Sequence, residues 1–98
     1  MHVGVCQIQF RLPENGTLKD KRQVVRSVTS RTRQKFNVSI AEVEDNDHHQ
    51  MLTLGVTCVS NDPRHANEVL SHVVEYIQSL RLDAELVDYQ LEIISGAS

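Results

Sequence analysis

The sequence predicts an α+β fold in which four strands and two helices follow one another in the order βαββαβ. Three observations predict this order. Apolar and polar residues alternate in four segments, as they do in strands that bury one face. In two longer segments apolar residues recur at helical spacing, and turn residues separate the six segments. This order is the split βαβ pattern of ferredoxin-like domains. We therefore expect a four-stranded antiparallel sheet, of strand order 4-1-3-2, with two helices on one face.

The strands are assigned from their alternation. The first predicted strand is residues 2–12, with a core-facing side made of Cys6, Ile8, Phe10 and Leu12. Residues 38–44 and 51–59 are expected to form a hairpin around the turn 45–49. In residues 51–59 the core-facing side is Leu52, Leu54, Val56 and Cys58. The last strand, residues 85–94, is expected to bury Val87, Tyr89, Leu91 and Ile93 and to leave uncovered Leu86, Asp88, Gln90 and Glu92.

The first predicted helix, residues 17–36, carries seven of the ten Lys and Arg residues. Thr17 is its cap, and Asp20 follows three positions later, which is the spacing of a capping box. At 3.6 residues per turn, one side of this helix is largely apolar and is expected to face the sheet. That side contains Leu18, Val25, Val28, Thr32 and Phe36, with Val24 at its margin.

A second side of the same helix is basic. Lys19, Arg22, Arg26 and Arg33 share it and form a row about 20 Å long. Lys21 lies instead on the apolar side, so its aliphatic stem is expected to pass the end of the core. These five cations are the predicted anion- or nucleic-acid-binding residues.

The first turn of this helix breaks a local rule, because its cations stand where the helix dipole favours anions. Two explanations remain open. A phosphate bound at the helix start would compensate the charges. Alternatively, acidic side chains of the same molecule compensate them, and the predicted topology brings Glu44, Asp45 and Asp47 of the hairpin to the same end of the sheet.

The second predicted helix begins at Asp62 and Pro63, with an acceptor at the cap and proline at the first position. We interpret Ser60-Asn61-Asp62 as this cap rather than as part of an active site. The apolar side of the helix is Ala66, Val69, Leu70, Val73, Ile77 and Leu80.

Length and composition favour one cytoplasmic domain, residues 1–95, with a flexible tail at 96–98. Neither a signal peptide nor an apolar run of spanning length is recognisable. Cys6 and Cys58 lie on core-facing sides, so we expect reduced, buried thiols. Charge is uneven along the chain. Residues 1–36 hold eight Lys and Arg against two acidic residues, whereas residues 37–98 hold two against eleven.

The uncovered face of the sheet is expected to be mixed in polarity and to lack aromatic residues. RNA-binding domains of this topology stack bases on sheet aromatics, so recognition of RNA on this face is not expected. A partly apolar open sheet suggests instead a homodimer, formed either face to face or through an edge strand.

The hairpin residues 45–49, DNDHH, are the only candidate metal cluster, and both residue types are zinc ligands. No further ligands recur at diagnostic spacing, and Asp and Asn are ordinary turn residues. We therefore predict no metal and no cofactor. The sequence also contains no nucleophile with a neighbouring base and no phosphate-binding glycine loop, so we predict that the protein is not an enzyme.

Several segments together carry a family resemblance: LPEN at 12–15, LKDKR at 18–22, FNVSIAEV at 36–43, and LGV with VSND in 54–62. With them the chain resembles the YlxP-like family of small uncharacterised bacterial proteins over nearly its whole length. The resemblance implies a ferredoxin-like fold. Members look to be encoded among translation and ribosome-maturation factors, which implies RNA or ribosome work with no defined catalytic residue. His48 and His49 depart from the bulky apolar residues that relatives tend to have there.

Two functional hypotheses follow. In the first, the protein is an RNA- or ribosome-associated factor whose basic helix binds phosphate backbone without sequence specificity. In the second, it is a homo-oligomeric protein-interaction module with no nucleic-acid role, whose basic row meets an acidic surface of its own or of a partner. The first predicts strong salt dependence and sensitivity to nuclease, and the second predicts a stable dimer.

Overall fold

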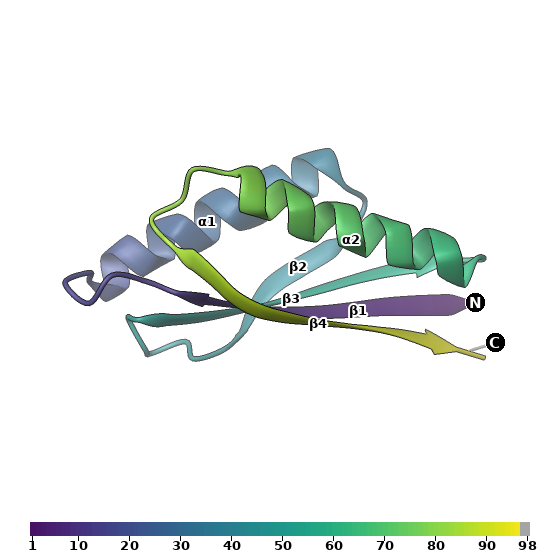
Figure 1. Ribbon diagram of the computed structural model, residues 1–98, viewed down its shortest axis with the longest axis horizontal. Coiled ribbons are helices and arrows are strands. Elements are labelled where there is room, and N and C mark those ends of the chain that lie inside the picture. The colour runs from purple at the N-terminus through teal and green to yellow at the C-terminus, as the bar shows by residue number, and fades with distance from the viewer. Residues whose placement is uncertain (97–98) are drawn as a thin grey trace.

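The computed structural model describes residues 1–96 and has the predicted order of elements; residues 97 and 98 of the predicted tail lie outside the described part. The elements are β1 (His2–Arg11), α1 (Leu18–Lys35), β2 (Ser39–Glu44), β3 (Met51–Ser60), α2 (Pro63–Ser79) and β4 (Glu85–Ser95). Both helices cover one face of the sheet, and the opposite face is open (Figure 1). The ferredoxin-like fold is confirmed.

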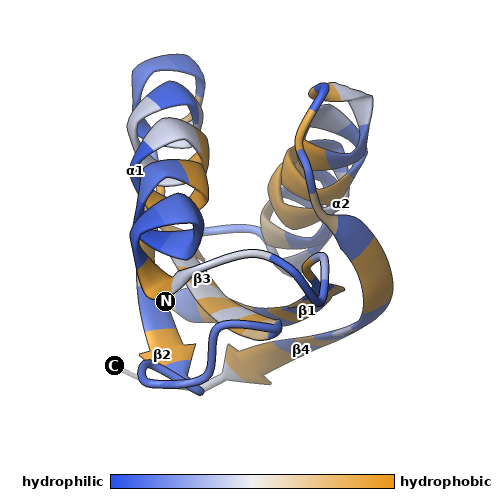
Figure 2. Cartoon of the chain, turned by 90° about the vertical axis from the view of Figure 1, so that its left-hand side faces the viewer, coloured by the Kyte–Doolittle hydropathy of each residue, from blue (hydrophilic) through white to orange (hydrophobic). Residues whose placement is uncertain are grey.

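The sheet has the order β2-β3-β1-β4, which is the predicted order read from the other end, and all neighbouring pairs are antiparallel. Figure 2 shows α1 above the β2 side of the sheet and α2 above the side of β1 and β4. The β1–α1 turn and the β2–β3 hairpin lie at the same end of the molecule, away from the two termini (Figure 1). This arrangement brings the hairpin to the start of α1.

The core follows the predicted alternation on the two central strands. All eight residues that were predicted to face the core from β1, from Leu12 just after it, and from β3 are buried. From α1 the buried residues are Lys21, Val28, Thr29 and Thr32, and from α2 they are Ala66, Leu70, Val73, Val74 and Ile77. The far end of α1 meets α2 through Phe36 and Tyr76, whose rings pack edge to face at 5.6 Å between centroids. The core is therefore aliphatic, with few aromatic contacts.

The prediction for β4 is wrong at its start. Phe10 of β1 pairs with Leu86 and Gln9 pairs with Asp88, so Val87 is an extra residue without a partner on β1. Such a bulge reverses the alternation on one side of it. Leu86 consequently packs against the core, whereas Val87 is 45% exposed. Tyr89, Leu91 and Ile93 keep the predicted core-facing side.

The two thiols lie on the core side of β1 and β3 and are free and buried. Burial raises the pKa of Cys6 to about 11, and desolvation likewise raises the pKa of Cys58. Thiolates are the reactive form of cysteine, so both thiols are shielded and uncharged near neutral pH.

We expect neither thiol to react with an alkylating reagent at pH 8 until denaturant is added. Because the pKa of Cys6 is higher in the folded chain, its contribution to stability is complete below pH 9 and is lost as the pH rises toward 11. The free energy of unfolding of wild type relative to Cys6→Ala should therefore fall by up to about 2 kcal/mol across this range. A constant difference between pH 8 and pH 11 would contradict the burial of the thiol.

Candidate nucleic-acid interface on helix α1

The N-terminus of α1 is capped by two side chains of the same segment, Thr17 and Asp20. Thr17 Oγ1 accepts a hydrogen bond from the Asp20 backbone N–H at 3.1 Å, and Asp20 Oδ2 accepts one from the Thr17 backbone N–H at 3.0 Å. The Thr17 backbone N–H donating to Asp20, followed by the contact with the Thr17 side chain, lowers the pKa of the Asp20 carboxyl. This is the predicted capping box. A carboxylate already stands at the positive end of the helix dipole, so a phosphate bound there would meet a like charge.

Lys21 does not belong to the exposed surface. Its side chain is buried, with 1% of the residue exposed, and its ammonium group lies 2.9 Å from Glu42 Oε2. The same Nζ donates hydrogen bonds to the carbonyl oxygens of Asp45 and His48, the latter at 2.8 Å. The sequence-based assignment of Lys21 to the anion site is therefore corrected, because its donors are used inside the molecule and no phosphate can reach them.

Glu42 is the functional group that the sequence reasoning missed. It faces the helices because it pairs with Leu54 on the core side of the sheet, and its side chain is 17% exposed. Glu42 Oε2 lies 2.9 Å from Lys21 Nζ, but the geometry is not that of a hydrogen bond, so the contact is an ion pair. The alternation of β2 could have predicted this position, because Glu42 shares one side of the strand with Ile40. A carboxylate buried beneath a helix needs a cation as its partner.

The β2–β3 hairpin is held by several contacts that converge on Asp45. This residue has a left-handed backbone conformation with φ of 61°, which is uncommon outside glycine, although Asp tolerates it better than most residues. Its carbonyl accepts hydrogen bonds from Lys21 Nζ and from the His48 N–H, and its Oδ2 accepts one from Thr53 Oγ1 at 2.8 Å. Thr53 alternates with the core-facing Leu52 and Leu54 and so belongs to the open face, yet it is 0% exposed and its hydroxyl is bonded to this loop.

The candidate metal ligands of the hairpin are partly used in these contacts. The Asp45 carboxylate accepts from Thr53, and the Nδ1 atom of His48 accepts from the Gln50 N–H at 3.1 Å. Across residues 1–96, no group of three His, Cys, Asp or Glu side chains is placed to hold a metal ion. The hydrogen bonds of Asp45 and His48 within the hairpin therefore account for the presence of these two residues without a metal ion.

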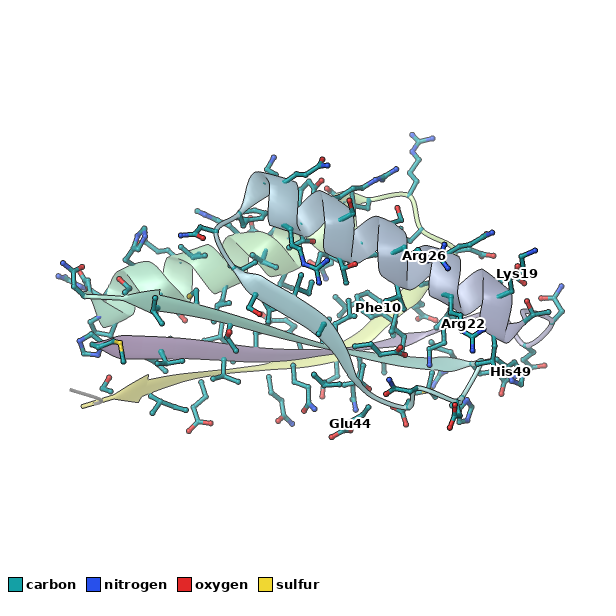
Figure 3. All side chains as sticks on the ribbon, turned by 180° about the vertical axis from the view of Figure 1, so that it is seen from behind. Phe10, Lys19, Arg22, Arg26, Glu44 and His49 are labelled. Carbon is teal, nitrogen blue, oxygen red and sulfur yellow. The ribbon has the colours of Figure 1, made fainter. Side chains whose placement is uncertain are left out.

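The other four predicted cations lie on the surface of α1. Lys19, Arg22 and Arg26 project from the side of the helix seen in Figure 3, above the edge strand β2. Arg33 belongs to the same side, and its Nη2 donates to the Ile40 carbonyl of β2 at 2.8 Å. We name these four residues the basic row.

No residue of the basic row makes a salt bridge within residues 1–96, where the ion pairs are Lys21–Glu42 and Arg64–Asp62. Asp20 is near enough to Lys19 for an electrostatic interaction, although its carboxylate is already bonded to Thr17. Two of the three acidic hairpin residues proposed for this role are bonded elsewhere, and none of the three makes a salt bridge within the described residues. Glu44 Oε1 accepts from Gln7 Nε2 at 3.4 Å on the open face, and Asp45 binds Thr53. Among the cations of α1 described here, Lys21 alone makes a salt bridge, and its partner Glu42 is not one of the hairpin acids that were proposed.

The open face of the sheet carries a shallow groove of about 650 Å³. The groove is lined by residues from all four strands, and those whose side chains face it are mainly small aliphatic or amide residues such as Val5, Gln7, Ala41 and Gln90. Val43 lies across Gly55, where an added Cβ atom would come within 2.8 Å of it. No Phe, Tyr or Trp lines this groove, so it offers no stacking platform for bases.

Comparison with known proteins identifies the family. A family model described as "Protein of unknown function (DUF503)" matches residues 3–91. The chain belongs to this DUF503, YlxP-like family. It is 31% identical over 77 residues to "Uncharacterized protein YlxP" of Bacillus subtilis strain 168, and the match covers 79% of this chain and 84% of that protein. The resemblance seen in the LPEN and LKDKR segments is thereby confirmed.

Two solved structures that the chain matches are distant from it in sequence. The chain resembles the "De novo designed protein Ferredog-Diesel" with a TM-score of 0.49 and 8% identity, over 92% of this chain and 83% of that one. It resembles the "BlsA photo-activated state" with the same TM-score and 16% identity, over 92% of this chain and 59% of that one. Neither α1 nor α2 has the length and apolar character that a membrane crossing requires.

Proposed function

We propose that this DUF503-family protein binds RNA through the basic row of α1, by contacts to the phosphate backbone. The observation that carries the proposal is that Lys19, Arg22 and Arg26 are exposed and unpaired with any acid within the described chain. Four cations along about 20 Å of helix match a polyanion better than a single small anion. The resemblance to proteins encoded among ribosome-maturation factors favours ribosomal RNA as the natural ligand.

The rigidity of α1 supports this role. The helix is capped at its start by Thr17 and Asp20, and Lys21 ties its first turn to the β2–β3 hairpin. A row built on a fixed helix presents its charges at constant spacing, which lowers the entropic cost of binding. α1 carries no aromatic residue on which a base could stack, so we propose backbone binding without sequence specificity and no catalytic step.

Salt dependence tests this function on the wild-type protein. With four phosphate contacts, a plot of log affinity against log salt should have a slope of about −2.8 to −3.6. Affinity for a ribosomal RNA fragment, measured by fluorescence anisotropy with nucleic-acid-free protein, should then fall roughly 50- to 150-fold between about 50 and about 200 mM salt. Binding that is unchanged by salt, or no binding at the lower concentration, would contradict the proposal.

A role in protein association is the second candidate, and it is favoured by a different surface. Val87, Tyr89 and Ile94 of the edge strand β4 are large hydrophobic residues that remain substantially exposed. Because β4 lies at the opposite margin of the sheet from β2 and α1, the two functions do not compete for one surface.

A further inference from the structure

We propose that two copies of this chain pair through the free edges of their β4 strands, antiparallel and centred on Leu91, and so form one continuous eight-stranded sheet. The proposal goes beyond RNA binding and does not depend on it. It rests on the contrast between the two sheet edges, on the direction of the backbone groups of β4, and on the placement of its charged residues.

The β2 edge is closed to a further strand. β2 has six residues, and its register with β3 shifts between Glu42 and Glu44. The Ile40 carbonyl points away from β3 and already accepts a hydrogen bond from Arg33 Nη2 at 2.8 Å. Short length, a bulge and a covering side chain are the features by which proteins protect sheet edges from pairing.

The β4 edge is long and open by comparison. β4 spans 11 residues, and its bulge lies at the beginning, beside Val87, which leaves the run from Asp88 onward regular. Tyr89 is 47% exposed although its side chain faces the helix side of the sheet. An exposed aromatic residue on the core-facing side of an edge strand is the position that a neighbouring strand would cover.

Backbone N–H and C=O groups of β4 point away from β1 and could bond to another strand. The Leu12 N–H donates to the Gln50 carbonyl at 2.8 Å, which makes even-numbered residues of β1 the ones that bond to β3. Hydrogen-bonded pairs alternate in an antiparallel ladder, so the odd-numbered residues of β1 face β4. Their partners on β4 include Gln90 and Glu92, which leaves the N–H and C=O groups of Leu91 directed outward.

The same parity is supported at both edges. On the β2 side, Ile40 lies opposite Val56, a residue bonded to β1 by this alternation, and the Ile40 carbonyl is indeed free to accept from Arg33. On the β4 side, the Tyr89 N–H donates to the Asp88 carboxylate at 2.8 Å rather than to β1. The Tyr89 N–H is thus directed outward but is already occupied by Asp88, and an arriving strand would meet the outward-directed groups of Leu91 and Ile93.

Charge disfavours two of the neighbouring registers. In a two-fold pairing centred on Gln90, Asp88 would face Glu92 of the other copy, and centring on Glu92 would place two Glu92 side chains opposite each other. Like charges directly opposite are destabilising. Centring on Leu91 places Glu92 opposite Gln90 and Asp88 opposite Ile94, without opposed carboxylates.

The same register matches the apolar side chains. On the helix side it places Tyr89 of each copy opposite Ile93 of the other, with the two Leu91 side chains at the two-fold axis. Aromatic and β-branched residues are favourable cross-strand partners. This self-complementarity is what a second copy supplies, as expected for an isologous interface. The strand order then places β2 and the basic row of each copy at the two outer ends of the sheet.

The experiment is sedimentation equilibrium of nucleic-acid-free protein from about 1 to about 500 µM, because a single strand-edge interface belongs to the small and weak class. We expect a reversible monomer–dimer equilibrium in this range. Gln90→Lys, which faces Glu92 in the proposed register, should tighten the dimer by about tenfold, and Gln90→Glu should weaken it by a similar factor. Gln90 is exposed on the open face, so both variants should fold, as circular dichroism can verify.

The double variant Gln90→Glu with Glu92→Lys exchanges the facing groups and should restore the dimer lost in Gln90→Glu. In the register centred on Gln90 the two position-90 residues would face each other, so Gln90→Lys would weaken that dimer instead. A monomer at every concentration, or a dimer that ignores residue 90 or responds to Lys and Glu in the same direction, would overturn the proposal. None of these outcomes bears on RNA binding, which is measured separately.

Discussion

Replacement of Lys21 by methionine should lower the free energy of unfolding by about 3 kcal/mol, which is the low end of the cost of removing one partner from a buried ion pair. Methionine fills the space of the aliphatic part of Lys21, so the loss of stability reports the contribution of the ammonium group. Glu42 would keep its charge beneath α1 without a cation, and the carbonyls of Asp45 and His48 would lose the donor that ties the hairpin to the helix. We place the cost at the low end because Glu42 retains some contact with solvent.

Urea denaturation at pH 7 measures this effect, and Lys19→Met is its matched control. Lys19 is two positions away and exposed, so its replacement should change stability by no more than about 0.5 kcal/mol. The variant Glu42→Gln should cost less than Lys21→Met, because it leaves no unpaired carboxylate beneath α1 and the ammonium keeps its two carbonyl acceptors. If Lys21→Met is as stable as the Lys19→Met control, the buried pair does not hold the hairpin to α1.

Reversal of two charges in the basic row, Arg22→Glu with Arg26→Glu, should reduce RNA affinity at low salt on the order of 100-fold. Two attractive contacts would be lost and two like charges would face the phosphates, each of which costs binding free energy. The slope of log affinity against log salt should become shallower by about 2, one for each phosphate contact removed. Stability should be little changed, because both arginines are exposed and make no ion pair within residues 1–96.

Arg31→Glu with Arg64→Glu is the control for net charge. It alters the total charge by the same amount at exposed positions outside the basic row, one of them on α2. A general effect of net charge would weaken both double variants equally, whereas binding by the basic row predicts a large loss only for the first. A pull-down from bacterial lysate at low salt, with and without nuclease, then shows whether ribosomal RNA or subunits are recovered by wild type alone.

Local pattern was sufficient for most of the fold. Alternation in β1 and β3 predicted their buried sides, the capping box predicted where α1 begins, and Asp62 with Pro63 predicted the start of α2. These features depend on neighbours within a few positions along the chain, so the sequence contains them directly. The basic row is of the same kind, because four cations at helical spacing share a side wherever the helix is placed.

Only the tertiary structure decided what depends on pairing between distant segments. The bulge at Val87 was hidden because β4 reads as regular alternation, and the extra residue exists only relative to β1. The environment of Lys21 was hidden because its cation meets Glu42 and the two hairpin carbonyls only after β2 has been placed beneath α1. The sequence by itself thus determined the elements, their order and the exposed charges, because these follow from local periodicity. The register of each strand pair decided which residues of β4 are buried and that Lys21 is unavailable to a ligand, because register is a property of two strands together.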